Sequence, residues 1–248
     1  MASHGQHDPT PLPALLPDPP IHPAHSTHAV NSALATLAAD AWHLTEGRTR
    51  AVLGIAGPPG AGKSTLARAL VAETERLHGA GSAAYLPLDG FHLSNAQLRR
   101  LGLAHRKGSE PSFDVRGYAA LLARVLDEDE QRAQHDLYVP DFDRGLDEPV
   151  AARHRVPPSA RLVVTEGNYL ACDLPGWREA RELMTRCWYL EASPGERQRR
   201  LVDRHVSHGR TPRAAHDWVA TNDEPNALLV AASRSRADRV LPQLDQLP

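Results

Sequence analysis

The chain has 248 residues, of which 41% are hydrophobic and 23% charged, as in an ordinary folded globular protein. Its formal net charge of -2 argues against a broad basic surface for nucleic acid, and no apolar run approaches the length of a membrane span. With only two cysteines, the chain cannot form a disulfide framework or a four-cysteine zinc site. The N-terminus has no secretory signal pattern, so we expect a cytoplasmic protein. We expect no nucleic-acid partner and no membrane partner.

The first 29 residues predict a disordered leader ahead of a single domain over residues 30–248. The leader contains seven prolines and five histidines, and proline at this density removes the backbone hydrogen bonds of helices and sheets. Metal capture is the alternative interpretation of the histidines, whereas a disordered polar tail needs no further function.

From residue 30 onward, helical and strand-like patterns alternate. Apolar residues at helical spacing predict helices, and short apolar runs predict buried strands. Because strands and helices alternate, we expect an α/β fold in which helices cover both faces of a mainly parallel sheet. In chain order, the predicted elements are a helix over 30–46, strand 51–56, helix 63–78, strand 83–88, helices 94–101 and 115–130, strands 137–139, 161–165 and 186–190, helices 194–207, 213–221 and 226–236, and strand 237–241.

A glycine-rich loop follows the first predicted strand. Residues 57–64 match the pattern G-x-x-x-x-G-K-[ST], in which backbone N–H groups and the start of the next helix face one anion. We expect Lys63, one of only two lysines, to reach the β- and γ-phosphates of a nucleoside triphosphate and Ser64 to bind Mg²⁺. An incidental lysine in a glycine-rich turn is the alternative. The expected ATP-binding residues of the loop are Gly57, Pro58, Pro59, Gly60, Ala61, Gly62, Lys63, Ser64 and Thr65.

Three further segments carry a resemblance to a known family. They are residues 86–92 (LPLDGFH), residues 163–169 (VVTEGNY) and the arginine-rich stretch after Pro194. Together with the loop, they make the chain similar to the phosphoribulokinase/uridine kinase family, including its bacterial pantothenate kinase relatives. The resemblance implies a P-loop NTPase three-layer sandwich with an Arg-rich helical lid over about residues 194–221.

Two acidic residues end predicted strands, at the edge where open parallel sheets bind their ligands. Asp89 follows the second strand, which we expect beside the first, and a carboxylate there can accept the proton of an attacking hydroxyl. Glu166 ends the fourth strand, where the resemblance supports a role in binding the metal. A helix or turn cap is the alternative for Asp89, and a purely structural carboxylate is the alternative for Glu166.

Six arginines lie between residues 197 and 213. In the family that the chain resembles, the corresponding stretch is a lid that closes over the phosphates, where guanidinium groups neutralise the transferring phosphoryl group. A solvated helix face is the alternative interpretation. We expect phosphate contacts from Arg200, Arg204 and Arg210, with Arg204 in a catalytic role.

The segments between these elements are expected to bind the acceptor. The resemblance places residues 113–114 along an acceptor pocket, and it places the strand end at residues 142–144 where a ring and an arginine hold the acceptor. A core aromatic ring or a surface turn is the alternative in each case. The expected acceptor-binding residues are His92, Phe113, Asp114, Phe142, Arg144 and Tyr169.

These features predict an enzyme that phosphorylates a hydroxyl group of a small metabolite, with ATP and Mg²⁺ as cofactors. A nucleoside is the first choice of acceptor, and a pantothenate-like acid or a sugar is the alternative, because the loops at 106–116 and 139–144 match no single subfamily. The alternative from a different class of function is a protein that binds ATP as a sensor and catalyses no reaction. The resemblance also suggests that the protein forms a homodimer, since dimers are common among such enzymes.

Overall fold

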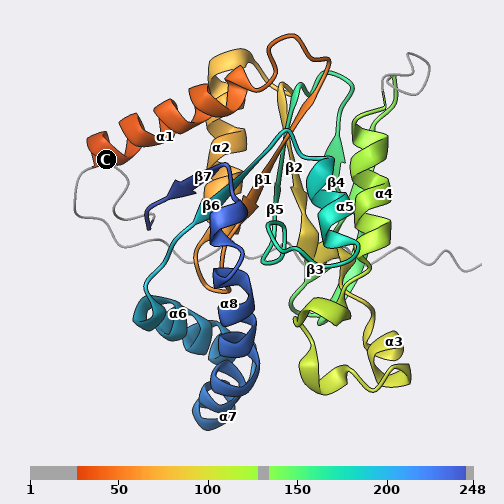
Figure 1. The fold of residues 1–248 in the computed structure, drawn as a ribbon, viewed down its shortest axis with the longest axis vertical. Helices are drawn as coiled ribbons and strands as arrows, with labels where there is room; N and C mark the ends of the chain where they lie inside the picture. Colours follow the sequence, from red (N-terminus) through yellow and green to blue (C-terminus); the bar gives the residue numbers. More distant parts are fainter. Residues whose placement is uncertain (1–26, 128–133, 244–248) are drawn as a thin grey trace, which may run out of the picture.

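A five-stranded parallel sheet forms the centre of the computed structural model, which describes residues 27–127 and 134–243 (Figure 1). Its strands are β1 (Ala51–Ala56), β2 (Ala83–Pro87), β5 (Leu162–Glu166), β6 (Arg186–Leu190) and β7 (Arg239–Leu241). They lie in the order β2-β5-β1-β6-β7, and all neighbouring pairs are parallel. The α/β class expected from the sequence is confirmed.

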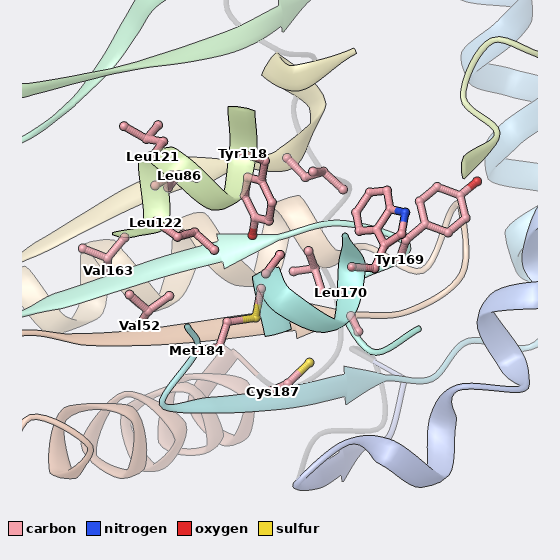
Figure 2. Close-up of a cluster of buried hydrophobic side chains, with 14 of the residues drawn as sticks. Val52, Leu86, Tyr118, Leu121, Leu122, Val163, Tyr169, Leu170, Met184 and Cys187 are labelled. Carbon is pink, nitrogen blue, oxygen red and sulfur yellow. The ribbon is translucent and has the colours of Figure 1, made fainter. Parts of the chain in front are cut away.

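Helices cover both faces of this sheet, which gives three layers (Figure 1). The covering helices are α1 (Thr27–His43) and α2 (Lys63–His78) on one face, and α4 (Val115–Val125) and α5 (Trp177–Glu182) on the other. Successive side chains of β1 point to opposite faces. Leu53 and Ile55 therefore pack with α1 and α2, whereas Val52 packs with α4 and α5 (Figure 2). Burial on both faces explains why this strand is a continuous apolar run.

Two further groups of elements lie at the carboxyl ends of the strands (Figure 1). The first group comes from the arginine-rich segment and contains α6 (Pro194–Ser207), α7 (Pro212–Trp218), a π-helical turn (Val219–Asp223) and α8 (Glu224–Ala231). Ser193 and Thr211 begin α6 and α7 because their hydroxyls accept backbone N–H groups of the first turn. The second group contains a 3₁₀ turn, η1 (Leu88–Phe91), and α3 (Asn95–Arg100).

A separate antiparallel hairpin contains the segment that was predicted as the third strand. β3 (Leu137–Asp143) pairs with β4 (Glu148–Val156) and does not join the parallel sheet. The prediction of a short sheet strand was wrong here, and β4 was missed. Most side chains of both strands are partly or fully exposed, so they lack the apolar run that identifies a central strand. The hairpin packs against β2 and η1.

The strand that leads to Asp89 also differs from the expectation. β5 lies between β1 and β2, so β2 is not beside β1. Glu166, the last residue of β5, consequently lies between the glycine-rich loop after β1 and Asp89 after β2. This order brings the glycine-rich loop, Glu166 and Asp89 to the same edge of the sheet.

Several boundaries differ from the prediction by a few residues. α1 begins at Thr27, inside the predicted leader, while residues 1–26 lie outside the described part of the chain. α4 and α8 end earlier than predicted, at Val125 and Ala231, and α5 was not predicted. Among the described helices, none combines the length and the apolar character that crossing a bilayer requires.

Gly90 offers a test of how the turn after β2 is fixed against the hairpin. A Cβ at Gly90 would lie 2.2 Å from the carbonyl oxygen of Pro140 in β3, which is backbone and has little room to move. We expect Gly90→Ala to lower the free energy of unfolding by about 2 kcal/mol or more, measured as a lower Tm. Gly195→Ala is the control, because nothing lies within 4 Å of a Cβ there. Equal Tm values for the two variants would contradict this packing.

Candidate active site

The glycine-rich loop joins β1 to α2, with its backbone close to two other segments. A Cβ at Gly57 would lie 2.5 Å from the carbonyl oxygen of Leu190, and one at Gly60 would lie 2.9 Å from that of Arg197. Gly60 also has a φ of 78°, which side-chain-bearing residues rarely adopt. Only glycine fits at these two positions, and the loop leads directly into the N-terminus of α2, which favours an anion.

Lys63 is the first residue of α2 and is 7% exposed. Its Nζ donates to the carbonyl oxygen of Pro58 (3.0 Å) and to Oδ1 of Asn168 (2.7 Å). Burial lowers the pKa of Lys63 to about 8, although the carboxylates of Glu166 and Asp89 act in the opposite direction. An additional negative charge, such as a triphosphate, would therefore stabilise the ammonium group.

Glu166 and Ser64 place oxygen atoms next to each other. Oε1 of Glu166 accepts hydrogen bonds from the Ser64 hydroxyl (3.0 Å) and from the Tyr85 hydroxyl (2.8 Å). Burial, together with the nearby carboxylate of Asp89, raises the pKa of Glu166, and a divalent cation would offset that effect. Oxygen ligands of this kind suit Mg²⁺. Within the described residues, no group of three or more His, Cys, Asp and Glu side chains forms another metal site.

Asp89 lies in η1, directly after β2. Burial raises the pKa of this carboxyl, but His92, Arg144, Arg204 and Lys63 together outweigh burial, so that its pKa is lower than usual. Asp89 is therefore ionised at neutral pH. Nη2 of Arg144 is 3.5 Å from its Oδ2, and the ring of His92 donates from Nδ1 to its main-chain oxygen (2.8 Å).

These groups line one cavity of about 720 Å³. It contains residues from the glycine-rich loop, the ends of β2 and β5, the hairpin and the lid helices. The expected site residues that line it are Pro59, Gly60, Gly62, Lys63, Ser64, Thr65, Asp89, His92, Phe113, Phe142, Arg144, Glu166, Arg200, Arg204 and Arg210. Gly57, Pro58 and Ala61 belong to the same loop but do not line the cavity.

The three lid arginines at the cavity differ in how their charges are balanced. Arg200 forms an ion pair with Glu196 (2.8 Å). Among the described residues, Arg204 and Arg210 have no carboxylate partner, and the guanidinium of Arg210 lies over the ring of Trp218, 4.0 Å from its centroid. Burial lowers the pKa of Arg204. Arg204 and Arg210 thus form no ion pair within the described residues, so their guanidinium groups are better placed to bind phosphate oxygens than that of Arg200.

Two residues expected to bind the acceptor do not line the cavity. The Asp114 carboxylate caps the N-terminus of α4 by accepting a hydrogen bond from the N–H of Gly117 (2.9 Å). Aspartate is one of the residues most common at this position of a helix. Tyr169 is fully buried, and its hydroxyl donates to the carbonyl oxygen of Gly108 (2.7 Å) behind the cavity wall. In this structure Asp114 thus starts a helix and Tyr169 supports a loop, and neither side chain lies at the cavity surface.

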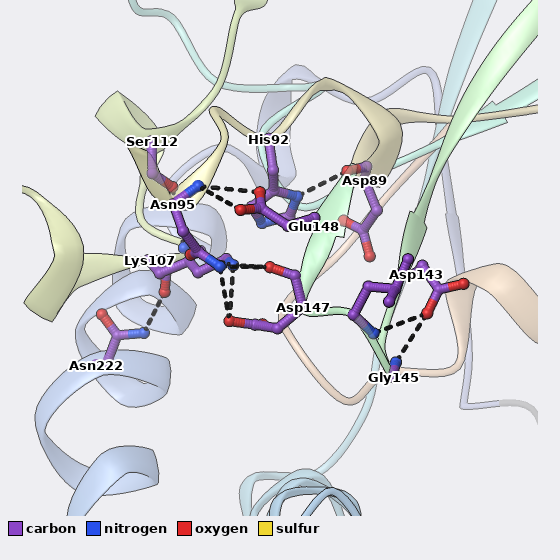
Figure 3. A network of polar contacts seen from close by, with 12 residues as sticks. Asp89, His92, Asn95, Lys107, Ser112, Asp143, Gly145, Asp147, Glu148 and Asn222 are labelled. Atoms are coloured by element: carbon purple, nitrogen blue, oxygen red, sulfur yellow. Dashed lines mark hydrogen bonds and ion pairs between the residues drawn. The ribbon is translucent and has the colours of Figure 1, made fainter. Parts of the chain in front are cut away.

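The sequence analysis expected the loop at residues 106–116 to bind the acceptor, but it missed the polar cluster that this loop forms beside Asp89. Lys107 contacts Asn95 and Asp147, and Asn222 of the π-helical turn donates to the Lys107 carbonyl oxygen (Figure 3). The composition contained a clue, because both lysines of the chain line this cavity. Asn168, which contacts Lys63, was also missed, although it lies within the TEGN segment.

Comparison with known proteins agrees with this arrangement. No family model matches the sequence. A protein of Schizosaccharomyces pombe, named as a putative uridine kinase, is 31% identical over 207 residues, which cover 81% of this chain and 86% of the relative. The chain belongs to the uridine kinase/phosphoribulokinase family of P-loop kinases. It is accordingly an ATP-dependent phosphotransferase that acts on a small molecule.

Other relatives of this P-loop kinase carry different names. The crystal structure of a putative fructose transport system kinase from Silicibacter sp. TM1040 is 35% identical, has a TM-score of 0.74, and covers 84% of this chain and 98% of its own. A pantothenate kinase of Mycolicibacterium gilvum is 40% identical over 74 residues, which are 30% of this chain and 24% of that protein. The names of the relatives therefore agree on a kinase and differ on the acceptor.

The unpaired charge of Arg204 leads to a prediction about the lid. We expect Arg204→Ala to lower kcat by about 100-fold or more, because its charge would stabilise the transferring phosphoryl group. Arg199→Ala is the matched control in the same helix, since Arg199 pairs with Glu196 and Asp203 on the exposed face. Steady-state kinetics of both variants provide the measurement, and equal kcat values would contradict the role of Arg204.

Proposed function

We propose that this P-loop kinase transfers the γ-phosphoryl group of Mg²⁺-bound ATP to a hydroxyl group of a small metabolite. The observation that supports this most directly is that the carboxylate of Asp89 lines the same cavity as Lys63 and Glu166. Asp89 can thus accept a proton next to the residues that would bind a triphosphate and a cation.

The phosphates would be held by the loop N–H groups, the N-terminus of α2 and the ammonium group of Lys63. Ser64 and Glu166 are the residues that would hold Mg²⁺, since their oxygens already lie 3.0 Å apart. When bound there, the cation neutralises charge on the phosphate oxygens. Lys63 keeps its orientation through Asn168, so the loop and the end of β5 form one preorganised unit.

Asp89 would act as the base for the acceptor. Its carboxylate accepts the proton of the acceptor hydroxyl, whose oxygen forms a bond to the γ-phosphorus while the bond from that phosphorus to the bridging oxygen breaks. The products are a phosphate ester and ADP. Arg204 and Arg210 would stabilise the charge on the transferring group and, with the lid helices, keep water away from it.

For the acceptor, we propose a nucleoside as the first candidate. The rings of His92, Phe113 and Phe142 gather at the cavity, with centroids 4.0 and 4.8 Å from His92, and the relative from Schizosaccharomyces pombe is named as a uridine kinase. A sugar and a pantothenate-like acid remain the alternatives, each supported by the name of one relative. A panel of these compounds, analysed for the mass of one added phosphoryl group, tests them directly.

A module that binds ATP without transferring its phosphoryl group is the other class of function. Such a module would be expected to have lost the base or the unpaired lid cations, and this chain retains Asp89, Arg204 and Arg210 at the cavity. No observation on this chain favours the sensor over the kinase.

The role of Asp89 predicts a separation of binding from catalysis. We expect Asp89→Asn to keep its affinity for ATP but to lose about a thousandfold or more in kcat, because an amide cannot accept the proton. ATP titration and acceptor-dependent ADP release measure the two effects. Asp173→Asn is the control, since Asp173 pairs with Arg178 on the exposed surface. Unchanged turnover in Asp89→Asn would remove Asp89 from the proposed role.

A further inference from the structure

Tyr85 lies behind the residues that would hold Mg²⁺, outside the machinery described so far. It belongs to β2, is buried, and does not line the cavity. Its hydroxyl donates a hydrogen bond to Oε1 of Glu166 in the neighbouring strand (2.8 Å). A buried tyrosine hydroxyl needs a hydrogen-bond partner, and the partner here is a carboxylate of the candidate metal site.

The register of the sheet brings these two side chains together. In the parallel pair of β2 and β5, Tyr85 lies opposite Val164, and Glu166 follows two residues later in β5. Because side chains two residues apart in a strand point to the same face, Glu166 shares the face of Val164 and Tyr85, which α2 covers. Ser64 lies in the first turn of α2, so both hydroxyl groups meet Glu166 on the same side of the sheet.

The two hydroxyl groups leave one oxygen of the carboxylate for a cation. Oε1 of Glu166 accepts the hydrogen bonds from Ser64 (3.0 Å) and from Tyr85, whereas Oε2 accepts none from the described residues. Glu166 is buried, yet it lines the cavity. A rotation that exchanged the two oxygens would break both hydrogen bonds. The Tyr85 hydroxyl therefore restricts the carboxylate before a cation arrives, which lowers the entropy cost of binding one.

The ring of Tyr85 is itself held from two sides. The guanidinium of Arg68 in α2 lies 4.8 Å from the ring centroid, and the ring of His154 in β4 packs against it in a T-shaped arrangement with centroids 5.2 Å apart. Asp141 of β3 connects these two side chains, because it pairs with Arg68 (3.6 Å) and with His154 (2.8 Å). The hydroxyl thus reaches Glu166 from a ring that both α2 and the hairpin contact.

Tyr118 shows what a tyrosine hydroxyl does in this sheet without contact to the site. Its side chain is fully buried on the opposite face, and its hydroxyl lies 2.7 Å from Oγ1 of Thr165, the residue before Glu166. Neither Tyr118 nor Thr165 lines the cavity. The two tyrosines therefore bury the same group beside adjacent residues of β5, but only Tyr85 reaches a residue that would hold the cation.

Given the phosphoryl transfer proposed above, we infer that Tyr85 is a positioning residue of this kinase. Its hydroxyl holds the carboxylate of Glu166 so that Oε2 is available to Mg²⁺ or to a water molecule bound to it. Tyr85 itself contacts neither the cation nor a substrate. Tyr85→Phe would keep the ring in the core and would leave the carboxylate held by Ser64 alone.

Calorimetric titration of the full-length kinase with ATP, in EDTA and in MgCl₂, tests this inference. In Tyr85→Phe, we expect the affinity for metal-free ATP to stay within about twofold of the wild type and the increase in affinity produced by Mg²⁺ to fall by about tenfold, as is typical when a partner of a metal ligand is removed. Tyr118→Phe is the matched control, because it also removes one buried hydroxyl. It should lower Tm by a comparable amount and keep the wild-type response to Mg²⁺.

A double-mutant cycle with Glu166→Gln tests whether the hydroxyl acts through Glu166. In that background, Tyr85→Phe should have no further effect on the response to Mg²⁺, and a further effect would overturn the inference. An unchanged Mg²⁺ response in Tyr85→Phe, an equal decrease in Tyr118→Phe, or loss of folding in Tyr85→Phe would also overturn it, and each would leave the proposed function intact. A wild-type affinity for ATP that does not depend on Mg²⁺ would contradict the proposed function as well.

Discussion

The site depends on one buried positive charge. Lys63 loses most of its water on folding, and burial lowers its pKa to about 8. Two hydrogen bonds and the negative charges of Glu166 and Asp89 support the ammonium group, and a triphosphate would add the remaining stabilisation. The strand order contributes to this, because β5 lies between β1 and β2 and places Glu166 next to the loop, with Asp89 one strand beyond it.

The charged groups of the cavity come from separate parts of the fold. Arg204 lies in α6 and Arg210 lies between α6 and α7, and neither forms an ion pair among the described residues. Lys107 comes from the loop before α4 and is neutralised by the turn of the hairpin.

The sequence predicted the parts of the molecule whose pattern is local. Buried strands such as β1 are continuous apolar runs in the sequence. The loop at residues 57–64 needs glycine where its backbone packs closely against other segments, and the sequence motif already specifies glycine at those positions. The hairpin could not be predicted in this way, since its strands are largely exposed and its pairing depends on contacts with β2 and η1. The sequence placed Lys107 in a loop expected to bind the acceptor, but it could not show the contact of Lys107 with Asp147, which lies 40 residues away. Asp114 and Tyr169 were assigned to the acceptor because residue type alone does not show which way a side chain points.

Calorimetric titration of ATP tests the central claim about Lys63 most directly. The wild-type kinase and Lys63→Met would each be titrated with and without Mg²⁺, with Tm measured as a control for folding. We predict that the wild type binds ATP more tightly with Mg²⁺, and that Lys63→Met remains folded but binds at least about tenfold more weakly, since it lacks the charge beside the phosphates. Equal affinity of the two proteins for ATP, or no effect of Mg²⁺ on the wild type, would contradict the account.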